Sequence, residues 1–98
     1  MLKHLVMWKL KGEGAAKREN IQKVKSALES CRDAVPGMLK YEIGVDIGTD
    51  SGPWDIALCS EFTDRAALDA YQQHPKHLAI KPIIGPLRES RAAVDYEV

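Results

Sequence analysis

The opening strand-like stretch LKHLVMWKL, at positions 2–10, constrains the fold more than any other part of the chain. Successive side chains of a β-strand point to opposite faces, so this stretch has two distinct faces. One face would carry Leu2, His4, Val6, Trp8 and Leu10, and the other Lys3, Leu5, Met7 and Lys9. Both faces are apolar at their centres, which is typical of a strand covered on both sides. The fold must therefore supply two apolar layers around this strand.

His4 is the single polar group on an otherwise apolar face of this stretch. The more common outcome for such a histidine is a satisfied side chain at the frayed end of a strand. The second interpretation is that His4 faces a cavity. Both interpretations remain open from the sequence.

The middle of the chain switches from helical to strand spacing. From about residue 15 to residue 35, apolar side chains recur three and four positions apart, which predicts one helix stopped by Pro36-Gly37. Alternation then predicts a strand over 39–45 with one apolar face and a central strand over 54–62. The helical apolar residues are Ile21, Val24, Leu28, Cys31 and Val35, and those of the first strand are Leu39, Tyr41, Ile43 and Val45.

The second half of the chain is broken by turn residues and prolines. Residues 48–53 form a loop by composition. Thr63 or Asp64 is expected to cap a helix over 65–73, and residues 90–98 alternate as a last strand. Between them, two prolines are expected to leave only short turns. These prolines are Pro82 and Pro86, and the turns would include Ile83, Ile84 and Leu87.

The resulting order, β-α-β-β-α-β, predicts one α+β domain over residues 1–98 with four antiparallel strands and two helices on one side. The sheet face away from the helices should then be polar, but the strands carry more apolar side chains than two small helices can cover. A second copy of the same chain is the simplest cover. We therefore predict a homodimer that closes into a barrel through Leu5, Met7, Ile56, Leu58, Val94 and Tyr96.

Charge and cysteine content narrow the classes of partner and site. Lys plus Arg and Asp plus Glu number 14 each, with no like-charged block, so we expect no nucleic-acid or membrane partner. The N-terminal residues lack the long apolar run of a signal peptide, which favours a cytoplasmic protein. Cys31 and Cys59 are isolated, and the three histidines form no metal motif, so we expect no metal site and no cofactor.

The most chemically dense stretch is AYQQHPKHLAIK at positions 70–81, which holds two of the three histidines, a tyrosine and a proline. Pro75 should end or bend the helix that leads to Tyr71, and it suits the first position of a new helical turn. Such a bend turns His77 back toward Tyr71. The stretch is predicted to be a corner that gathers polar side chains.

Five segments carry a family resemblance, and they are Lys3-His4, Val35-Pro36-Gly37, Asp55-Ile-Ala-Leu, Tyr71-Gln-Gln-His-Pro-Lys-His77-Leu-Ala and Ser90-Arg-Ala-Ala-Val-Asp-Tyr96. Over essentially its whole length the chain resembles the stress-responsive α/β-barrel domain (Dabb) family of small dimeric proteins. The resemblance implies a ferredoxin-like dimeric α+β barrel. Most members have no assigned reaction, and one plant relative is a polyketide cyclase that closes a linear polyketone by intramolecular aldol condensation.

The resemblance to that cyclase implies an acid/base pair made of Tyr71 and His77. Around the pocket it implies the ligand-binding residues His4, Val6, Trp8, Asp55, His74 and Asp95. Trp8 stands where a pocket for an alkyl tail would want a medium aliphatic side chain, and its bulk should shorten the pocket. Some plant relatives hold a cation by backbone carbonyls, which would lie near Val35 here.

Aldol-type chemistry needs a base beside a carbonyl and a donor for the enolate oxygen. A histidine with an ordinary pKa of about 6.5 suits the first task, and the hydroxyl of Tyr71 suits the second. Asp95 is expected to fix the tautomer of His77. Alternatively, Tyr71 is an amphipathic filler and His74 only caps the next turn. Two hypotheses remain: a small-molecule-binding dimer with cyclase or lyase chemistry, and a structural or stress-associated homodimer without turnover.

Overall fold

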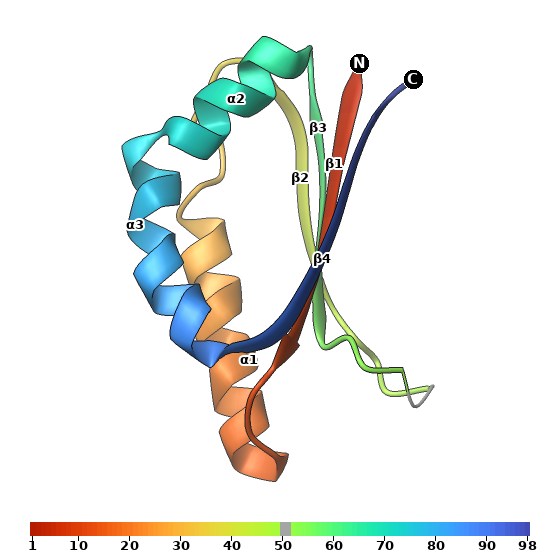
Figure 1. The fold of residues 1–98 in the computed structure, drawn as a ribbon, viewed down its shortest axis with the longest axis vertical. Coiled ribbons are helices and arrows are strands. Elements are labelled where there is room, and N and C mark those ends of the chain that lie inside the picture. The colour runs from red at the N-terminus through yellow and green to blue at the C-terminus, as the bar shows by residue number, and fades with distance from the viewer. Residues whose placement is uncertain (50–51) are drawn as a thin grey trace.

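The computed structural model describes residues 1–49 and 52–98, so the predicted loop at 48–53 lies partly outside the described residues. Within these described residues, eight elements follow one another (Figure 1). They are β1 (Leu2–Leu10), α1 (Gly14–Glu29), β2 (Met38–Val45), β3 (Ile56–Phe62), α2 (Arg65–Gln73), α3 (Pro75–Ile84), the 3₁₀ turn η1 (Gly85–Leu87) and β4 (Arg88–Glu97). No helix in the part of the chain that the structure describes is long and apolar enough to cross a membrane.

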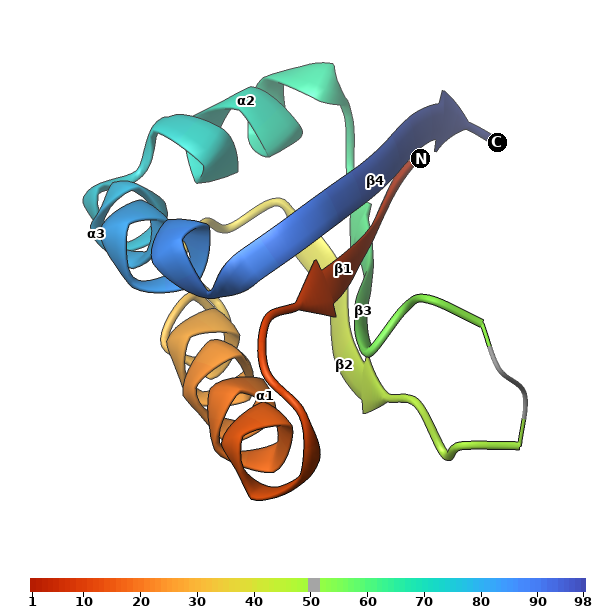
Figure 2. The same ribbon diagram turned by 60° about the horizontal axis from the view of Figure 1, so that its bottom comes forward.

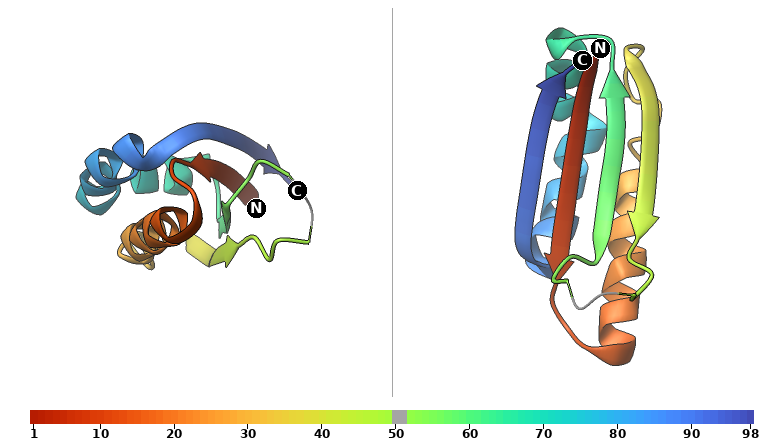
Figure 3. Two further views of the ribbon diagram at one scale, coloured as in Figure 1. Left: turned by 90° about the horizontal axis from the view of Figure 1, so that it is seen from below. Right: turned by 90° about the vertical axis from the view of Figure 1, so that its right-hand side faces the viewer.

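The four strands form one antiparallel sheet in the order β2-β3-β1-β4. All three helices lie on one side of this sheet, and the other side is open, as the right-hand view of Figure 3 shows. The chain ends meet where the Val98 amide donates to the Met1 carbonyl at 3.0 Å. The predicted ferredoxin-like α+β fold is therefore confirmed, with one more helix than the sequence predicted.

The helix-covered face of the sheet, called here the inner face, holds the core. The alternation predicted for residues 2–10 is confirmed, because Leu2, His4, Val6, Trp8 and Leu10 are all buried there. Helix α1 adds Val24 and Leu28, which lie about one turn apart on a single apolar stripe. The core is completed from β3 and the two later helices by Ile56, Leu58, Phe62, Leu68, Tyr71, Ile80 and Ile84.

The open side, called here the outer face, carries apolar side chains that stay partly exposed among the described residues of the single chain. Met7, Val94 and Tyr96 are 39%, 54% and 41% exposed, and Leu5 on β1 is half-buried. The prediction that Ile56 and Leu58 belong to this face is wrong. Their backbone partners on β1 are Trp8 and Val6, so both side chains point to the inner face and are 2% exposed.

The first helix ends at Glu29, six residues before the predicted stop at residue 35. Asp33 adopts a φ of 59°, in the left-handed region that a helix cannot contain. Cys31 and Val35 lie beyond the end of the helix but are still buried. Because both are apolar core residues, they extend the helical spacing of apolar residues past the helix itself. At the end of this segment Gly37 passes α2 so closely that an added Cβ would lie 2.5 Å from the Ala67 Cβ, and only glycine fits.

The strand β2 also departs from simple alternation. Its register with β3 shifts between Met38 and Lys40, so Leu39 falls in an irregularity and is 57% exposed instead of joining the apolar face. Tyr41 is buried beyond this point, and Val45 at the end of the strand is exposed. The predicted apolar face is therefore reduced to its centre.

The corner predicted around Pro75 is confirmed: α2 ends, and α3 begins at Pro75, with an extended residue, His74, between them (Figure 2). The prediction that Pro82 breaks the chain into short turns is wrong, because α3 runs through Pro82 to Ile84. A proline removes one hydrogen bond to the carbonyl four residues earlier. Only two helical residues follow it here, so the lost bond lies in the last turn.

Candidate functional site

A cavity of about 520 Å³ opens between the inner face of the sheet and α3. This volume falls in the range of about 300–1,000 Å³ that small-molecule sites occupy. Residues of β1, β3, β4 and all three helices line it. They are His4, Val6, Trp8, Leu28, Leu58, Tyr71, Gln72, His77, Ile80, Lys81, Ile84, Gly85, Arg88 and Arg91.

His77 lies in the wall of this cavity because the break at His74 starts a new helix. Its Nδ1 is 3.0 Å from the Gln72 carbonyl oxygen. A carbonyl only accepts, so Nδ1 carries the proton and Nε2 of the neutral ring keeps a free lone pair. Burial lowers the pKa of His77, opposed by the bond to Gln72 and assisted by the positive charge of Lys81. The ring is therefore neutral at pH 7 and able to accept a proton.

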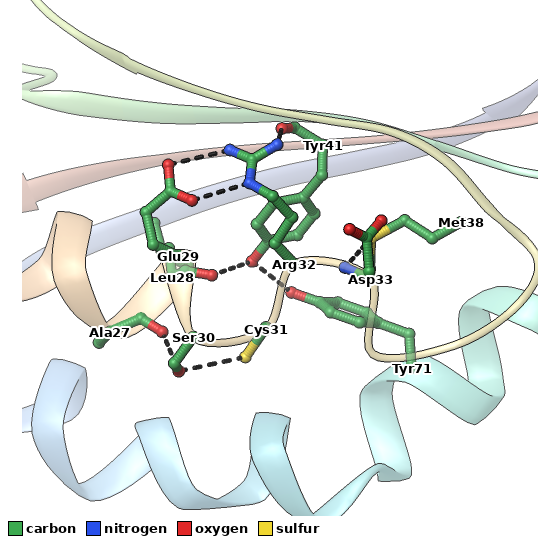
Figure 4. A network of polar contacts seen from close by, with 10 residues as sticks. All are labelled: Ala27, Leu28, Glu29, Ser30, Cys31, Arg32, Asp33, Met38, Tyr41 and Tyr71. Carbon is green, nitrogen blue, oxygen red and sulfur yellow. Dashed lines mark hydrogen bonds and ion pairs between the residues drawn. The ribbon is translucent and has the colours of Figure 1, made fainter.

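Tyr71 lies next to His77, with ring centroids 4.8 Å apart. Its hydroxyl is 3.1 Å from that of Tyr41, and the Tyr41 hydroxyl donates to the Leu28 carbonyl at 2.8 Å (Figure 4). Because Tyr41 has only one hydrogen, Tyr71 is the donor between the two hydroxyls. The hydroxyl of Tyr71 is thus buried and partnered, and it does not reach solvent as an amphipathic filler would.

Burial keeps both tyrosines protonated. It raises the pKa of Tyr71 to about 12, and it raises the pKa of Tyr41 further. A hydroxyl of this kind can donate a hydrogen bond but is not a base near neutral pH. Arg32 holds Tyr41 from the other side by donating to its backbone carbonyl at 2.5 Å while pairing with Glu29 (Figure 4).

His4 is the second histidine of the cavity, and it is 3% exposed. Its Nδ1 bonds to the carboxylate of Asp95, directly opposite on β4. The expectation that Asp95 fixes the tautomer of His77 is therefore wrong: Asp95 fixes His4, and a backbone carbonyl fixes His77. The His4 ring contacts Tyr71 edge-on, with centroids 6.4 Å apart. The rings of His4, Tyr71 and His77 thus lie next to one another along the cavity.

Trp8 lines the cavity without closing it, since the cavity remains with the indole in its wall. Val6, one step along the same face of β1, is also part of the lining. The Trp8 side chain is itself buried, 5% exposed, on the β1 side of the cavity. The lining as a whole combines apolar side chains of the strands and helices with polar groups from α2, α3 and β4.

Asp55 and His74 lie outside the cavity lining. The Asp55 carboxylate accepts from the Leu10 amide at 2.8 Å and from Lys17 at 3.1 Å, so it ties β1 to the first turns of α1. His74 accepts from the Lys76 amide at 3.1 Å and so caps α3, as the simpler interpretation of this residue stated. Both are structural in this arrangement.

Sequence reasoning missed three cations at the cavity, Lys81, Arg88 and Arg91. It also missed Tyr41, whose role depends on contact with a residue 30 positions away. A larger depression of about 610 Å³ lies beside β2, but its lining lacks histidine and its Arg32 is already paired with Glu29. Within the described residues, no three His, Cys, Asp or Glu side chains gather to hold a metal ion.

Comparison with known proteins gives one family and many similar folds. Residues 2–98 match the family model of the stress responsive A/B barrel domain. A dimeric protein of unknown function with a ferredoxin-like fold from Bacteroides fragilis is 32% identical, with a TM-score of 0.84 over 99% of this chain and 95% of that one. A dimeric ferredoxin-like protein of unknown function from Thermobifida fusca is 27% identical, with a TM-score of 0.87 over 99% and 90%.

A hydroxynitrile lyase from Passiflora edulis has a TM-score of 0.80 at 18% identity, over 99% of this chain and 92% of that one. At this identity the likeness shows the fold alone. No protein of curated function matches the chain.

Proposed function

The chain belongs to the stress-responsive A/B barrel domain family, and on that basis we propose that it is a homodimer that binds a small carbonyl compound in the cavity between sheet and helices. Within this site, His77 acts as a base and Tyr71 as a hydrogen-bond donor. The chemistry is of the aldol cyclase or lyase type and needs no cofactor.

The observation that carries the proposal is the state of His77. The Gln72 carbonyl occupies its Nδ1, burial lowers its pKa, and its side chain lines the cavity. A neutral histidine with a free Nε2 can take the proton beside a bound carbonyl at neutral pH. A histidine held only for packing does not require this arrangement.

Tyr71 has the complementary role. Its raised pKa, about 12, keeps the hydrogen in place, so the hydroxyl donates to a carbonyl oxygen on which negative charge develops. Donation requires that the hydroxyl turn from Tyr41 to the ligand. The 3.1 Å separation of the two hydroxyls is a weak bond that such a turn gives up at small cost.

The homodimer follows from the outer face. Leu5, Met7, Val94 and Tyr96 bring apolar side chains together on one partly exposed sheet face, which is typical of an interaction surface. The relatives from Bacteroides fragilis and Thermobifida fusca are described as dimeric. Two copies that pair these surfaces would give the barrel.

A second candidate is a homodimer without turnover, structural or ligand-binding only. The hydrogen bond from Tyr71 to Tyr41 favours it, because the donor is already used inside the protein. The hydroxynitrile lyase does not decide between the two candidates, since its likeness extends to the fold alone.

A thermal-shift screen of short ketones, 1,3-diketones and aldehydes tests the proposal. A ligand at 100 times its dissociation constant adds about 2.7 kcal/mol of apparent stability. His77→Asn and Tyr71→Phe should each weaken the binding of any hit, and should abolish turnover if there is any. His74→Asn is the matched control, because asparagine keeps the helix cap and His74 lies outside the cavity.

The non-catalytic candidate predicts the opposite ordering. His77→Asn would then lower the melting temperature by several degrees without changing any ligand affinity, and Tyr71→Phe would be nearly silent. Such a result would end the proposal of a site at this corner.

A further inference from the structure

We propose that the cavity selects anionic ligands, and that Lys81, Arg88 and Arg91 at its rim hold a carboxylate or phosphate group of the ligand. This inference rests on the proposed function, because it concerns the same cavity. It adds the charge of the ligand, which neither the fold nor the family gives.

The charge of the cavity lining is one-sided. The chain as a whole is balanced, with 14 basic and 14 acidic residues. Among the described residues, the lining nevertheless includes three cations and no carboxylate. The nearby acid Asp95 is bonded to His4.

The three cations are also unpaired among the described residues. Several lysines and arginines outside the lining form ion pairs, for example Lys9 with Glu89, Lys17 with Asp55 and Arg65 with Glu97. None of the pairs within residues 1–49 and 52–98 includes Lys81, Arg88 or Arg91. Their donors are left for a ligand.

The backbone of β4 places the two arginines on the same face. Residues three apart in a regular strand point to opposite faces. Here the register between β1 and β4 shifts, so that Arg91 lies opposite Trp8 and Arg88 lies opposite Leu10, both on the inner face. Without this bulge the residue opposite Leu10 would be Glu89, which instead pairs with Lys9 at 3.7 Å. Bulges commonly re-aim side chains beside functional sites.

The arrangement fits a ligand with an anionic end and a carbonyl end. Guanidinium groups bind carboxylate and phosphate through paired hydrogen bonds, and two of them on neighbouring positions suit one oxyanion. Lys81 and Arg91 also assist burial in lowering the pKa of His77, so the rim and the base lie within electrostatic reach of each other. The anion would stay at the rim while the carbonyl reaches Tyr71 and His77.

The test compares 4-oxooctanoate with its neutral amide, 4-oxooctanamide, by calorimetry at low salt. The acid should bind the wild-type protein about tenfold more tightly than the amide, since hydrogen bonds to charged groups are the stronger ones. Arg88→Gln and Arg91→Gln should each remove most of this preference by weakening the binding of the acid far more than that of the amide. Arg18→Gln, the same charge loss on α1 outside the lining, should change neither affinity.

The outcomes separate this inference from the proposed function. Equal affinity for acid and amide, or a preference that survives in both arginine variants, overturns the anion site. If the arginine variants lose the preference while His77→Asn and Tyr71→Phe leave the affinity for both compounds unchanged, the anion site is supported and the proposed function is removed. If neither compound binds, both fall. Inorganic phosphate that displaces the acid indicates a general oxyanion site, and failure to displace it indicates one shaped for a carboxylate.

Discussion

The two faces of the sheet use alternate residues of the same four strands, yet they differ in what completes them. On the inner face, Val6 and Leu58 pair across strands and are 1% and 2% exposed, because the helices of the same chain cover them. On the outer face, Leu5 lies between Cys59 and Val94, and Val94 is 54% exposed. An apolar side chain therefore stabilises the single chain on the inner face and, in the proposed dimer, association on the outer face.

The largest loss of stability is expected from a charge placed on the inner face of the sheet. Leu58→Lys should abolish folding, because the cost of burying an unpaired ammonium is comparable with the whole free energy of unfolding of a typical domain, roughly 5–15 kcal/mol. Leu58→Ala should cost about 2–5 kcal/mol. Urea unfolding followed by circular dichroism measures both. A folded, monomeric Leu58→Lys protein would instead place Leu58 at the dimer interface.

The same substitution on the outer face should have a smaller effect of another kind. Leu5→Lys should leave the chain folded and convert the proposed dimer into a monomer at micromolar concentration, which sedimentation measures. Leu78→Lys, at an exposed leucine of α3, is the control and should remain dimeric. A stable wild-type monomer at that concentration would contradict the proposed dimer.

The two cysteines report the same dissociation. Cys59 lies opposite Leu5 on the outer face, whereas Cys31 is fully buried and burial raises its pKa. A thiol reagent should modify Cys59 in the Leu5→Lys monomer faster than in the wild-type protein. Cys31 should stay unreactive in both.

The smallest expected effect is the pH dependence of stability that results from the burial of His77. Its pKa is lowered by burial, so the unfolded chain binds this proton more readily than the folded one. The contribution of the neutral His77 ring to the free energy of unfolding is complete above a pH of about 6.5, and it is lost as the pH falls below that value. His77→Asn should therefore lose less stability than the wild-type protein between about pH 7.5 and about pH 5, and His74→Asn should follow the wild type. Parallel curves for His77→Asn and wild type would show that burial does not perturb this ring.

The sequence predicts a helix or strand well where the spacing of its apolar residues matches the pattern of burial. Residues 2–10 alternate without interruption, and their faces are as expected. The face of Ile56 and Leu58 could not be read from β3 alone, because both of its faces carry apolar residues and only pairing with β1 decides between them. The spacing of apolar residues shows which side chains of a strand share a face. The pairing with neighbouring strands shows which face is covered by the helices.

The same limit applies to the site. The corner at Pro75 is local, so the residues of this segment alone predict that His77 lies near Tyr71. The partner of Asp95 depends on pairing between the first and last strands, 91 positions apart, and so His4 could not be distinguished from His77. Arg88 and Arg91 stayed hidden because alternation places them on opposite faces, and nothing in their residue types announces a bulge.

Because of the bulge in β4, the charge at the cavity rim depends on the number of residues in this strand as well as on their types. Deletion of Glu89 would remove the extra residue and leave Arg88 opposite Leu10. Deletion of Arg88 would instead bring Glu89 into that position and exchange a cation for a carboxylate. A lineage of such proteins can thus reverse the charge at this one position of the lining by losing one codon, with Lys81, Arg91 and every other residue of the lining unchanged.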